Sequence, residues 1–345
     1  MVKRKPHFLM RTILFSLALA FQLSVSAQNM QTVLFESWTN NAWQNSVRLT
    51  YTYAGNYPVS LLQEGWSQNA WANSAQTTFT NNANGSVTNS IIKSWNGTTS
   101  TWYNMQQTAT SYNAANKPLL STSQGYTNNA WVNSMQESYA YDANNHQTNF
   151  VEHYWNAGTS SWDNVNQRNY TNDANGFAVQ YVLQLWSSGS WSDQSRVSYT
   201  NNPSGQPVIT LTESWSATSG SWTPVSKEMS SYDANGHMTQ TAYQSMDPST
   251  GSWVSVSQAT MTINPDGTLA QYTSQTWNAS TSSWQNFQRV TYTYGITTGI
   301  REQSLSPADL QPVYYDLQGR VTERSFNQLL IEQIGNTRRK VIIQD

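Results

Sequence analysis

Hydrophobic and polar positions alternate after each of a series of regularly spaced tryptophans. The stretch 43–53 is the clearest case: Trp43 and the aromatic and aliphatic residues from Val47 to Tyr53 occupy one parity, and Gln, Ser, Arg and Thr occupy the other. A period of two with β-branched and aromatic residues predicts a strand, here with Trp43 and Tyr53 on one face. The stretch that precedes each such strand, for example 208–211, is shorter and has apolar residues at both parities. We therefore expect pairs of strands that recur about every 30 residues.

Two kinds of turn separate the predicted strands. One follows the Tyr-rich strand and reads YDANG at 232–236 and NPDG at 264–267, which is the pattern of a type I turn closed by a glycine in the left-handed conformation. The other has four or six residues and lies between two aromatic positions. Because both lengths are even, the flanking aromatic residues can lie opposite each other, on the same face of a hairpin.

The paired aromatic positions account for all 16 tryptophans. Nine close a loop and seven open one, with Tyr126 and Met246 in the two remaining opening positions. We predict that the pairs are cross-strand clasps, each contributing about 0.5–1.5 kcal/mol beyond its buried area. The closing residues are Trp43, Trp71, Trp102, Trp131, Trp162, Trp191, Trp222, Trp253 and Trp284, and the opening ones are Trp38, Trp66, Trp95, Trp155, Trp186, Trp215 and Trp277.

Nine units predict an all-β fold of about eighteen strands in an antiparallel meander over 28–295. One unit has too few apolar residues to bury a core alone, so neighbouring units must stabilise one another. We expect a long open sheet, elongated or coiled, followed by a small sandwich-like β domain over 296–345. The alternative is closure into an outer-membrane barrel. Against it, a lipid face needs a continuous apolar band, whereas Asn45, Asn73 and Asn133 interrupt the aromatic face.

The first residues of the chain indicate that the protein is exported, and its composition limits its chemistry. Basic residues, an apolar stretch over 12–25 and the small residues at 25–27 predict a signal peptide over 1–27. Its removal takes four of 17 basic residues, leaving 13 against 19 acidic ones, a formal charge of −6. This balance gives no basic patch for nucleic acid. The chain has no cysteine, which excludes disulfides and thiol chemistry.

The last 48 residues are richer in charge and carry three ordered sequence blocks: VYYDLQGR at 313–320, LLIEQIG at 329–335 and KVII at 340–343. They resemble the type A sorting domain of the type IX secretion system of Gram-negative bacteria, although the family's glycine before the second block is missing. The resemblance implies passage across the outer membrane and then release or attachment to surface lipopolysaccharide. Its motif falls on Tyr315, Asp316, Leu317, Gly319, Arg320, Gly335 and Lys340. The YDANG turns more weakly resemble YD/Rhs-type repeats of bacterial surface proteins.

No residue pattern predicts catalysis. His146 and His237 occupy the same turn position three units apart, and Asp142 and Asp233 occupy turn positions where aspartate caps the backbone. Glu36, Glu64, Glu152 and Glu213 recur before the opening aromatic position, which indicates a surface or ladder role. We therefore expect no enzyme, cofactor or metal.

We expect a secreted or outer-membrane-surface protein that acts in adhesion, with the type IX machinery and lipopolysaccharide, glycans or other extracellular polymers as candidate partners. The alternatives are a polyvalent carbohydrate-binding protein and the outer-membrane barrel. Exposed aromatic rings could stack on sugars while amides bind hydroxyls. The candidate contacts are Trp38, Trp43, Trp66, Trp71, Trp95, Trp102, Trp155, Trp162, Trp186, Trp191, Trp215, Trp222, Trp277 and Trp284.

Overall fold

The computed structural model describes residues 29–295, 313–315, 321–322, 329–334 and 337–342, and all regular structure in these ranges is β-strand. The predicted signal peptide lies outside the described residues. Eighteen strands form the first unit: β1 (Met30–Thr39), β2 (Ala42–Ala54), β3 (Tyr57–Ser67), β4 (Ala70–Asn81), β5 (Val87–Asn96), β6 (Thr101–Tyr112), β7 (Pro118–Thr127), β8 (Ala130–Tyr141), β9 (Gln147–Asn156), β10 (Ser161–Asn172), β11 (Ala178–Ser187), β12 (Ser190–Asn201), β13 (Pro207–Ser216), β14 (Ser221–Tyr232), β15 (Met238–Asp247), β16 (Ser252–Ile263), β17 (Leu269–Asn278) and β18 (Ser283–Tyr294).

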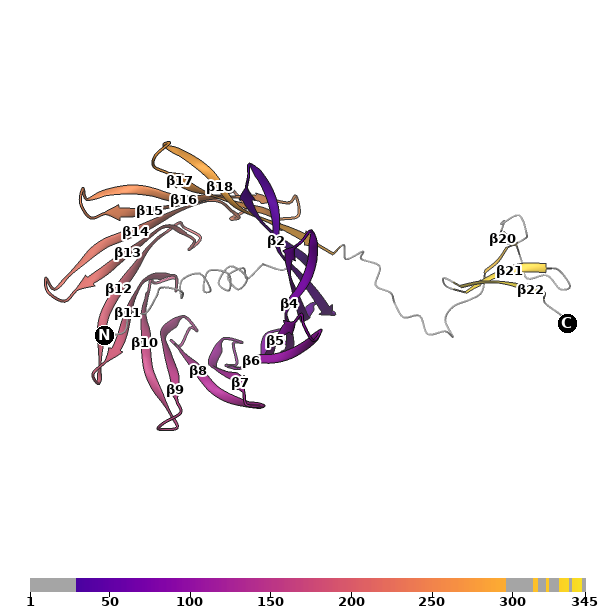
Figure 1. Cartoon of the computed structure of the whole chain (residues 1–345), viewed down its shortest axis with the longest axis horizontal. Helices are drawn as coiled ribbons and strands as arrows, with labels where there is room; N and C mark the ends of the chain where they lie inside the picture. The colour runs from indigo at the N-terminus through magenta and orange to yellow at the C-terminus, as the bar shows by residue number, and fades with distance from the viewer. Residues whose placement is uncertain (1–28, 296–312, 316–320, 323–328, 335–336, 343–345) are drawn as a thin grey trace. The chain divides into compact units, whose positions relative to one another are not determined.

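The sheet closes on itself. Each strand pairs antiparallel with the strands before and after it in sequence, and β1 pairs with both β2 and β18. In Figure 1 the strands follow one another around a ring. The expectation of an open meander is therefore wrong. Closure removes the two unpaired edges that such a sheet would expose to other chains.

A β-bulge in each hairpin decides which side chains share a face. In β2 the register shifts so that Ser46 has no partner, while Trp43 pairs with Trp38 and Leu49 pairs with Val33. The extra residue moves Trp43 to the face opposite Leu49, which corrects the prediction that Trp43 and Tyr53 share a face. Corresponding shifts occur in the other eight hairpins.

The two faces differ in chemistry. We call one the Trp face; it carries the aromatic pairs and residues such as Glu36 and Arg48. We call the other the Tyr face; it carries residues such as Val33, Leu49 and Tyr292. Both assignments follow from the strand registers, because residues that pair across an antiparallel ladder point to the same side.

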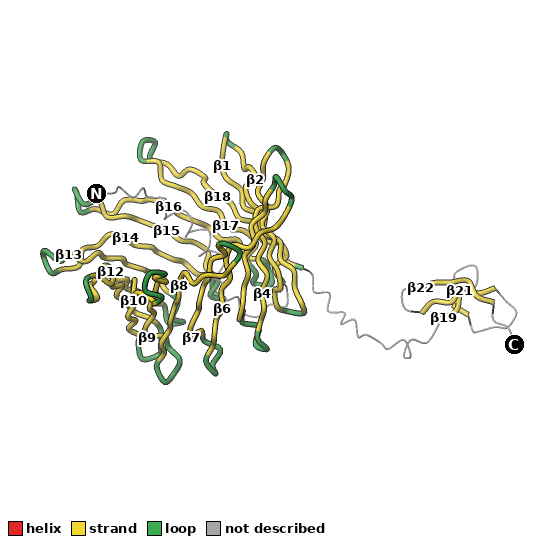
Figure 2. The backbone as a smooth tube through the Cα atoms, turned by 60° about the horizontal axis from the view of Figure 1, so that its bottom comes forward, coloured by secondary structure: helices red, strands yellow, loops and turns green. Residues whose placement is uncertain are grey.

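The turns gather at the two ends of the barrel and differ in kind (Figure 2). The Trp end has the turns inside each hairpin, such as Asn40–Asn41, where both residues have positive φ as a type I′ turn requires. The Asx end has the turns between hairpins. There the predicted type I turn is confirmed: Asp173 Oδ1 accepts hydrogen bonds from the backbone N–H of Asn175 and Phe177, and Gly176 has φ of 84°.

The buried aliphatic cluster lies where the barrel closes. Val290 of β18 is fully buried and packs with Val33 of β1 and Leu49 of β2, with Phe35 and Tyr292 around them. At this seam the ladder joins strands from opposite ends of the chain. The cluster therefore reinforces the one strand pairing that no short turn supports.

The chain divides into two compact units between Gly295 and Ile296. In the second unit the described residues form one four-stranded antiparallel sheet in the order β20-β19-β21-β22, not the sandwich-like domain we expected. Its strands are β19 (Val313–Tyr315), β20 (Val321–Thr322), β21 (Leu329–Ile334) and β22 (Thr337–Ile342).

Candidate functional site

The tryptophans form the predicted clasps. In eight hairpins the two aromatic residues pair across the ladder with ring centroids 4.8–5.1 Å apart, mostly edge to face. Met246 takes the aromatic position opposite Trp253 in the ninth. Most of these rings are half-buried against their partner, although Trp186 is 37% exposed. The fourteen candidate ligand-contacting tryptophans thus lie in pairs around one end of the barrel, each pair holding its own hairpin together.

A second set of side-chain pairs joins neighbouring hairpins on the Trp face. Arg48 of β2 bonds Glu64 of β3 at 2.7 Å, and Arg196 of β12 bonds Glu213 of β13 at 2.7 Å. Each guanidinium also stacks on a tryptophan two strands further on: Arg48 lies 4.7 Å from the centroid of Trp71. Glu36, Glu64 and Glu213 are therefore ladder residues, as predicted, but the prediction missed their arginine partners; Glu152 lies opposite Asn166 and Glu137 on the Tyr face.

Amide pairs occupy the corresponding boundaries elsewhere. Gln167 Nε2 donates to Gln184 Oε1 at 2.7 Å, and Gln184 Nε2 donates onward to Asp193 Oδ1 at 2.7 Å. Gln258 and Gln275 repeat the first bond at 2.7 Å. Amide pairs and ion pairs thus occupy equivalent positions at different boundaries of the barrel.

The barrel closes with the same kind of pair. Arg289 of β18 binds Glu36 of β1 through two hydrogen bonds, Nε to Oε2 at 2.6 Å and Nη2 to Oε1 at 2.7 Å, and Glu36 is buried. A bidentate contact fixes the plane of both groups, so it sets the register of the seam.

The Asx end forms a collar of contacting turns. The Cα of Gly176 faces the ring of His146 from the previous turn, and that of Gly205 faces the ring of Phe177. In each case a Cβ would collide with the ring, and the positive φ already favours glycine.

The turn histidines bond carboxylates. His146 Nδ1 lies 3.1 Å from Asp142 Oδ2, and His237 Nδ1 lies 3.0 Å from Asp233 Oδ2. Hydrogen bonds from His237 lower the pKa of Asp233. The third histidine, His153, lies in β9, and its buried Nδ1 has no hydrogen-bond partner. The two dyads belong to separate turns, which favours a capping role.

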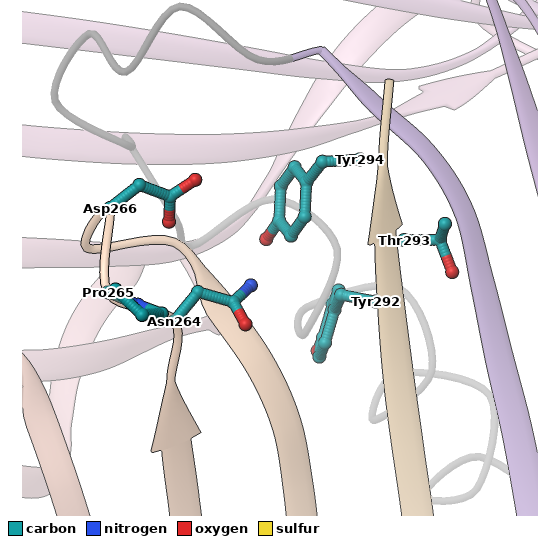
Figure 3. Close-up of a pocket in the computed structure, with 6 residues that line it drawn as sticks. All are labelled: Asn264, Pro265, Asp266, Tyr292, Thr293 and Tyr294. Atoms are coloured by element: carbon teal, nitrogen blue, oxygen red, sulfur yellow. The ribbon is translucent and has the colours of Figure 1, made fainter. Parts of the chain in front are cut away.

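A shallow cavity of about 420 Å³ lies at the Asx end, beside the last strand. In Figure 3 the rings of Tyr292 and Tyr294 reach from β18 toward the turn that contains Asp266. The Tyr294 hydroxyl donates to Leu269 O, and Asp266 Oδ1 accepts from the Thr268 hydroxyl at 2.6 Å. The Tyr294 hydroxyl and Asp266 Oδ1 therefore already have protein partners.

Two further negative findings apply to the described residues. They contain no cluster of three or more His, Asp or Glu side chains suited to a metal ion. They also contain no helix whose length and apolar character would let it cross a membrane. The absence of enzymatic activity stays a prediction.

The sorting-motif residues are only partly described. Tyr315 pairs with Val321 and Ile331 in the second unit, and Lys340 pairs with Ile331. Asp316, Leu317, Gly319, Arg320 and Gly335 lie outside the described residues. No protein-family model matches the chain, so neither the sorting-domain nor the YD-type resemblance gains support from that comparison.

No curated protein matches the chain either. Among solved structures, a porin-like protein from Bacteroides uniformis is 12% identical with a TM-score of 0.40, over 77% of this chain and 98% of that one. A porin-like protein from Bacteroides vulgatus is 9% identical with a TM-score of 0.29, over 78% and 100%. A protein from Bacteroides fragilis described as a putative 6-phosphogluconolactonase is 7% identical with a TM-score of 0.31, over 76% of this chain and 95% of that one. Scores this low do not establish a shared fold, so closure rests on the strand pairing itself.

Closure also corrects the main functional expectation. An adhesive surface ribbon presupposed an open sheet, extended or coiled, with its length available for contact. The chain instead forms a ring in which β1 and β18 pair. The architecture is that of the outer-membrane alternative, since outer-membrane barrels are closed, antiparallel and usually even in strand number.

Proposed function

We propose that the protein is a β-barrel of the bacterial outer membrane whose Trp face lines a water-filled lumen. The observation that carries the proposal is the closed ring of eighteen antiparallel strands. Only helices and closed barrels leave no unpaired backbone groups in hydrocarbon. The strands have 10–13 residues, against the roughly 9–11 that a tilted strand needs to span a bilayer.

The distribution of charge supports this orientation. Of the 14 Asp, Glu, Lys and Arg residues inside β1–β18, leaving out Asp247 at a hairpin tip, nine lie on the Trp face and five on the Tyr face. Those five are Glu137, Glu152, Asp163, Arg168 and Glu228, in β8–β10 and β14. Apart from Asp247 at the tip of β15, the Tyr face has no charged side chain on the eleven consecutive strands β15–β18 and β1–β7. The same sector contains the cluster around Val290, whose side chains are covered by neighbouring protein side chains.

The proposal limits where lipid can touch the wall. A charge at the bilayer midplane costs about 2–4 kcal/mol, so the sector β8–β10 would face protein, headgroups or water. Amides and hydroxyls such as Gln44 and Ser274 also interrupt the uncharged sector. We therefore expect weaker anchoring than a barrel with a continuous apolar band would have.

Fractionation of the native host tests the proposal. We expect the chain in the outer-membrane fraction, resistant to alkaline carbonate and released by detergent. An unboiled sample should migrate faster in SDS gels than a boiled one, because a closed barrel stays compact in detergent. Recovery of the whole chain in the aqueous supernatant after carbonate would overturn the proposal.

As a second candidate we propose that residues 296–345 direct export through the type IX machinery, which would carry the barrel across the outer membrane instead of leaving it as a spanning protein. The ordered blocks at 313–320, 329–335 and 340–343 support this, as does the division of the chain between Gly295 and Ile296. Deleting 296–345 should leave the barrel in the periplasm. Normal surface delivery of the shortened chain would contradict this role.

A further inference from the structure

One position on the Trp face decides whether a closing tryptophan lies under a cation. It is the position of Arg48, whose guanidinium stacks on Trp71 in the following hairpin. The strand registers place one residue of every hairpin there. Four of the nine are basic and lie 4.7–5.0 Å from the ring centroid of the next closing tryptophan: Arg48, Arg196, Lys227 and Arg289. The other five are Gln76, Gln107, Gln136, Gln167 and Gln258.

The glutamines are not spread evenly around the barrel. Four of them precede consecutive hairpins, whose closing tryptophans are Trp102, Trp131, Trp162 and Trp191. The fifth precedes Trp284 in β18. An indole face under a cation is already occupied, whereas an indole beside a neutral amide can stack on a ligand. One arc of the wall therefore carries aromatic rings that are open to a ligand.

The same arc is uncharged on the Trp face. None of the Trp-face residues of β6–β11 is Asp, Glu, Lys or Arg. We call this surface the amide sector. The three Arg–Glu pairs lie outside it, at β2/β3, at β12/β13 and at the seam. The aromatic residues of the amide sector are Trp102, Tyr126, Trp131, Trp155, Trp162 and Trp186, which is the most exposed tryptophan of the chain at 37%.

Amides stand beside these rings in fixed positions. Gln124 Oε1 accepts a hydrogen bond from Gln107, and Gln124 Nε2 donates to Asn133 Oδ1 at 2.8 Å. Asn104, Asn133 and Asn164 each follow a closing tryptophan by two residues, so each shares the face of that ring. An amide side chain offers both donors and acceptors. The sector therefore combines apolar ring faces with held donors and acceptors.

This combination fits a neutral sugar chain. The C–H face of a sugar ring is apolar and stacks on an indole, while the hydroxyls at its edge bond amides. Closing tryptophans of neighbouring hairpins are two strands apart, about 9–10 Å in a sheet, so a linear oligosaccharide can reach several hairpins. A charged chain would find no opposite charge in the sector, and its desolvation would be uncompensated.

We propose that the amide sector binds a neutral oligosaccharide along the wall of the lumen. The inference rests on the proposed function and names the class of solute that the lumen takes. All the residues involved lie on one face of the sheet. The arginine-covered tryptophans in the rest of the ring have a structural role only.

Fluorescence titration of the full chain tests the proposal, in a zwitterionic detergent without a sugar headgroup. The neutral probes are maltohexaose, cellohexaose and xylohexaose, and the charged probe is oligogalacturonate. We expect a saturable change in tryptophan fluorescence with at least one neutral probe. Oligogalacturonate should bind about tenfold or more weakly, because its carboxylates lose water without gaining a partner.

Two matched lysine substitutions locate the site. Gln107→Lys should place an ammonium over Trp131, as Lys227 lies over Trp253 with Gln244 as its ladder partner. It should weaken binding about tenfold by occupying one ring face. Gln258→Lys is the control: its ladder partner is also a glutamine, Gln275, but the ring it covers lies outside the amide sector. The control should bind within about twofold of the parent chain.

A second variant guards against misfolding, which circular dichroism would reveal. Gln136→Lys should reproduce the loss by covering Trp162. Absence of binding to all three neutral probes, equal weakening by Gln107→Lys and Gln258→Lys, or equally tight binding of oligogalacturonate would each overturn the amide sector. Because the titration is done in detergent, it does not depend on membrane location. Release of the chain by carbonate, with sugar binding intact, would refute the spanning barrel and retain the sector.

Discussion

Replacing Val290 with alanine tests the closure of the barrel. Val290 is fully buried, and its ladder partners are Phe35 of β1 on one side and Tyr272 of β17 on the other. The substitution removes two methyl groups at about 0.8 kcal/mol each and adds a cavity term, so we expect about 2 kcal/mol of lost stability. In an open sheet β18 would be an edge strand, and β1 would not cover Val290.

The assay is urea unfolding of the full chain, followed by tryptophan fluorescence. Val290→Ala should lower the midpoint with an unchanged slope, as a pure loss of stability does. Val132→Ala is the matched control, because Val132 lies on the same face and is 41% exposed; we expect less than about 0.5 kcal/mol there. Equal, small effects at both positions would refute the argument, since they would mean that β1 does not pack against β18.

Three other outcomes follow from the same geometry. Cysteines at the paired positions Leu34 and Thr291 should form a disulfide that shifts mobility in non-reducing SDS gels, and failure to cross-link under oxidation would contradict the seam. A double-mutant cycle for Trp95→Ala and Trp102→Ala should give a coupling of about 0.5–1.5 kcal/mol by urea unfolding, whereas additive effects would rule out the clasp. Gly176→Ala should lower stability by about 1–2 kcal/mol in the same assay because of its positive φ; a neutral effect would show that the collar is loose.

The clasps could be predicted because they are local. Trp38 and Trp43 are separated by an even loop, and antiparallel pairing then places them opposite each other. The bulge beside them could not be predicted. Its position is filled by Ser46, Ser74, Met105 or Phe287 in different hairpins, so no residue type marks it. That single unpaired residue reverses the face of everything beyond it.

Closure was hidden because its contacts span the chain. Arg48 and Glu64 are 16 residues apart, whereas Arg289 and Glu36 are 253 apart. The spacing nevertheless held a signal: the arginine lies five residues after a closing tryptophan, and the glutamate lies two before an opening one. Arg289 has no following glutamate in the repeats, and Glu36 has no preceding arginine. Because Arg289 and Glu36 each lack the partner that the other arginines and glutamates have, the sequence predicts that the first and last strands pair with each other.

The aromatic clasps lie within hairpins, whereas the polar pairs lie between hairpins. Each hairpin is therefore a structural unit, and the number of hairpins sets the circumference of the barrel. Eight of the nine hairpins contain an aromatic pair, and the ninth pairs Met246 with Trp253. Ion pairs and amide pairs occupy equivalent positions at boundaries between hairpins. Gain or loss of one 30-residue unit would change the ring by two strands and leave every local contact intact. Only the match between the first and last hairpins would have to be kept. Duplication or deletion of whole units could thus widen or narrow the lumen.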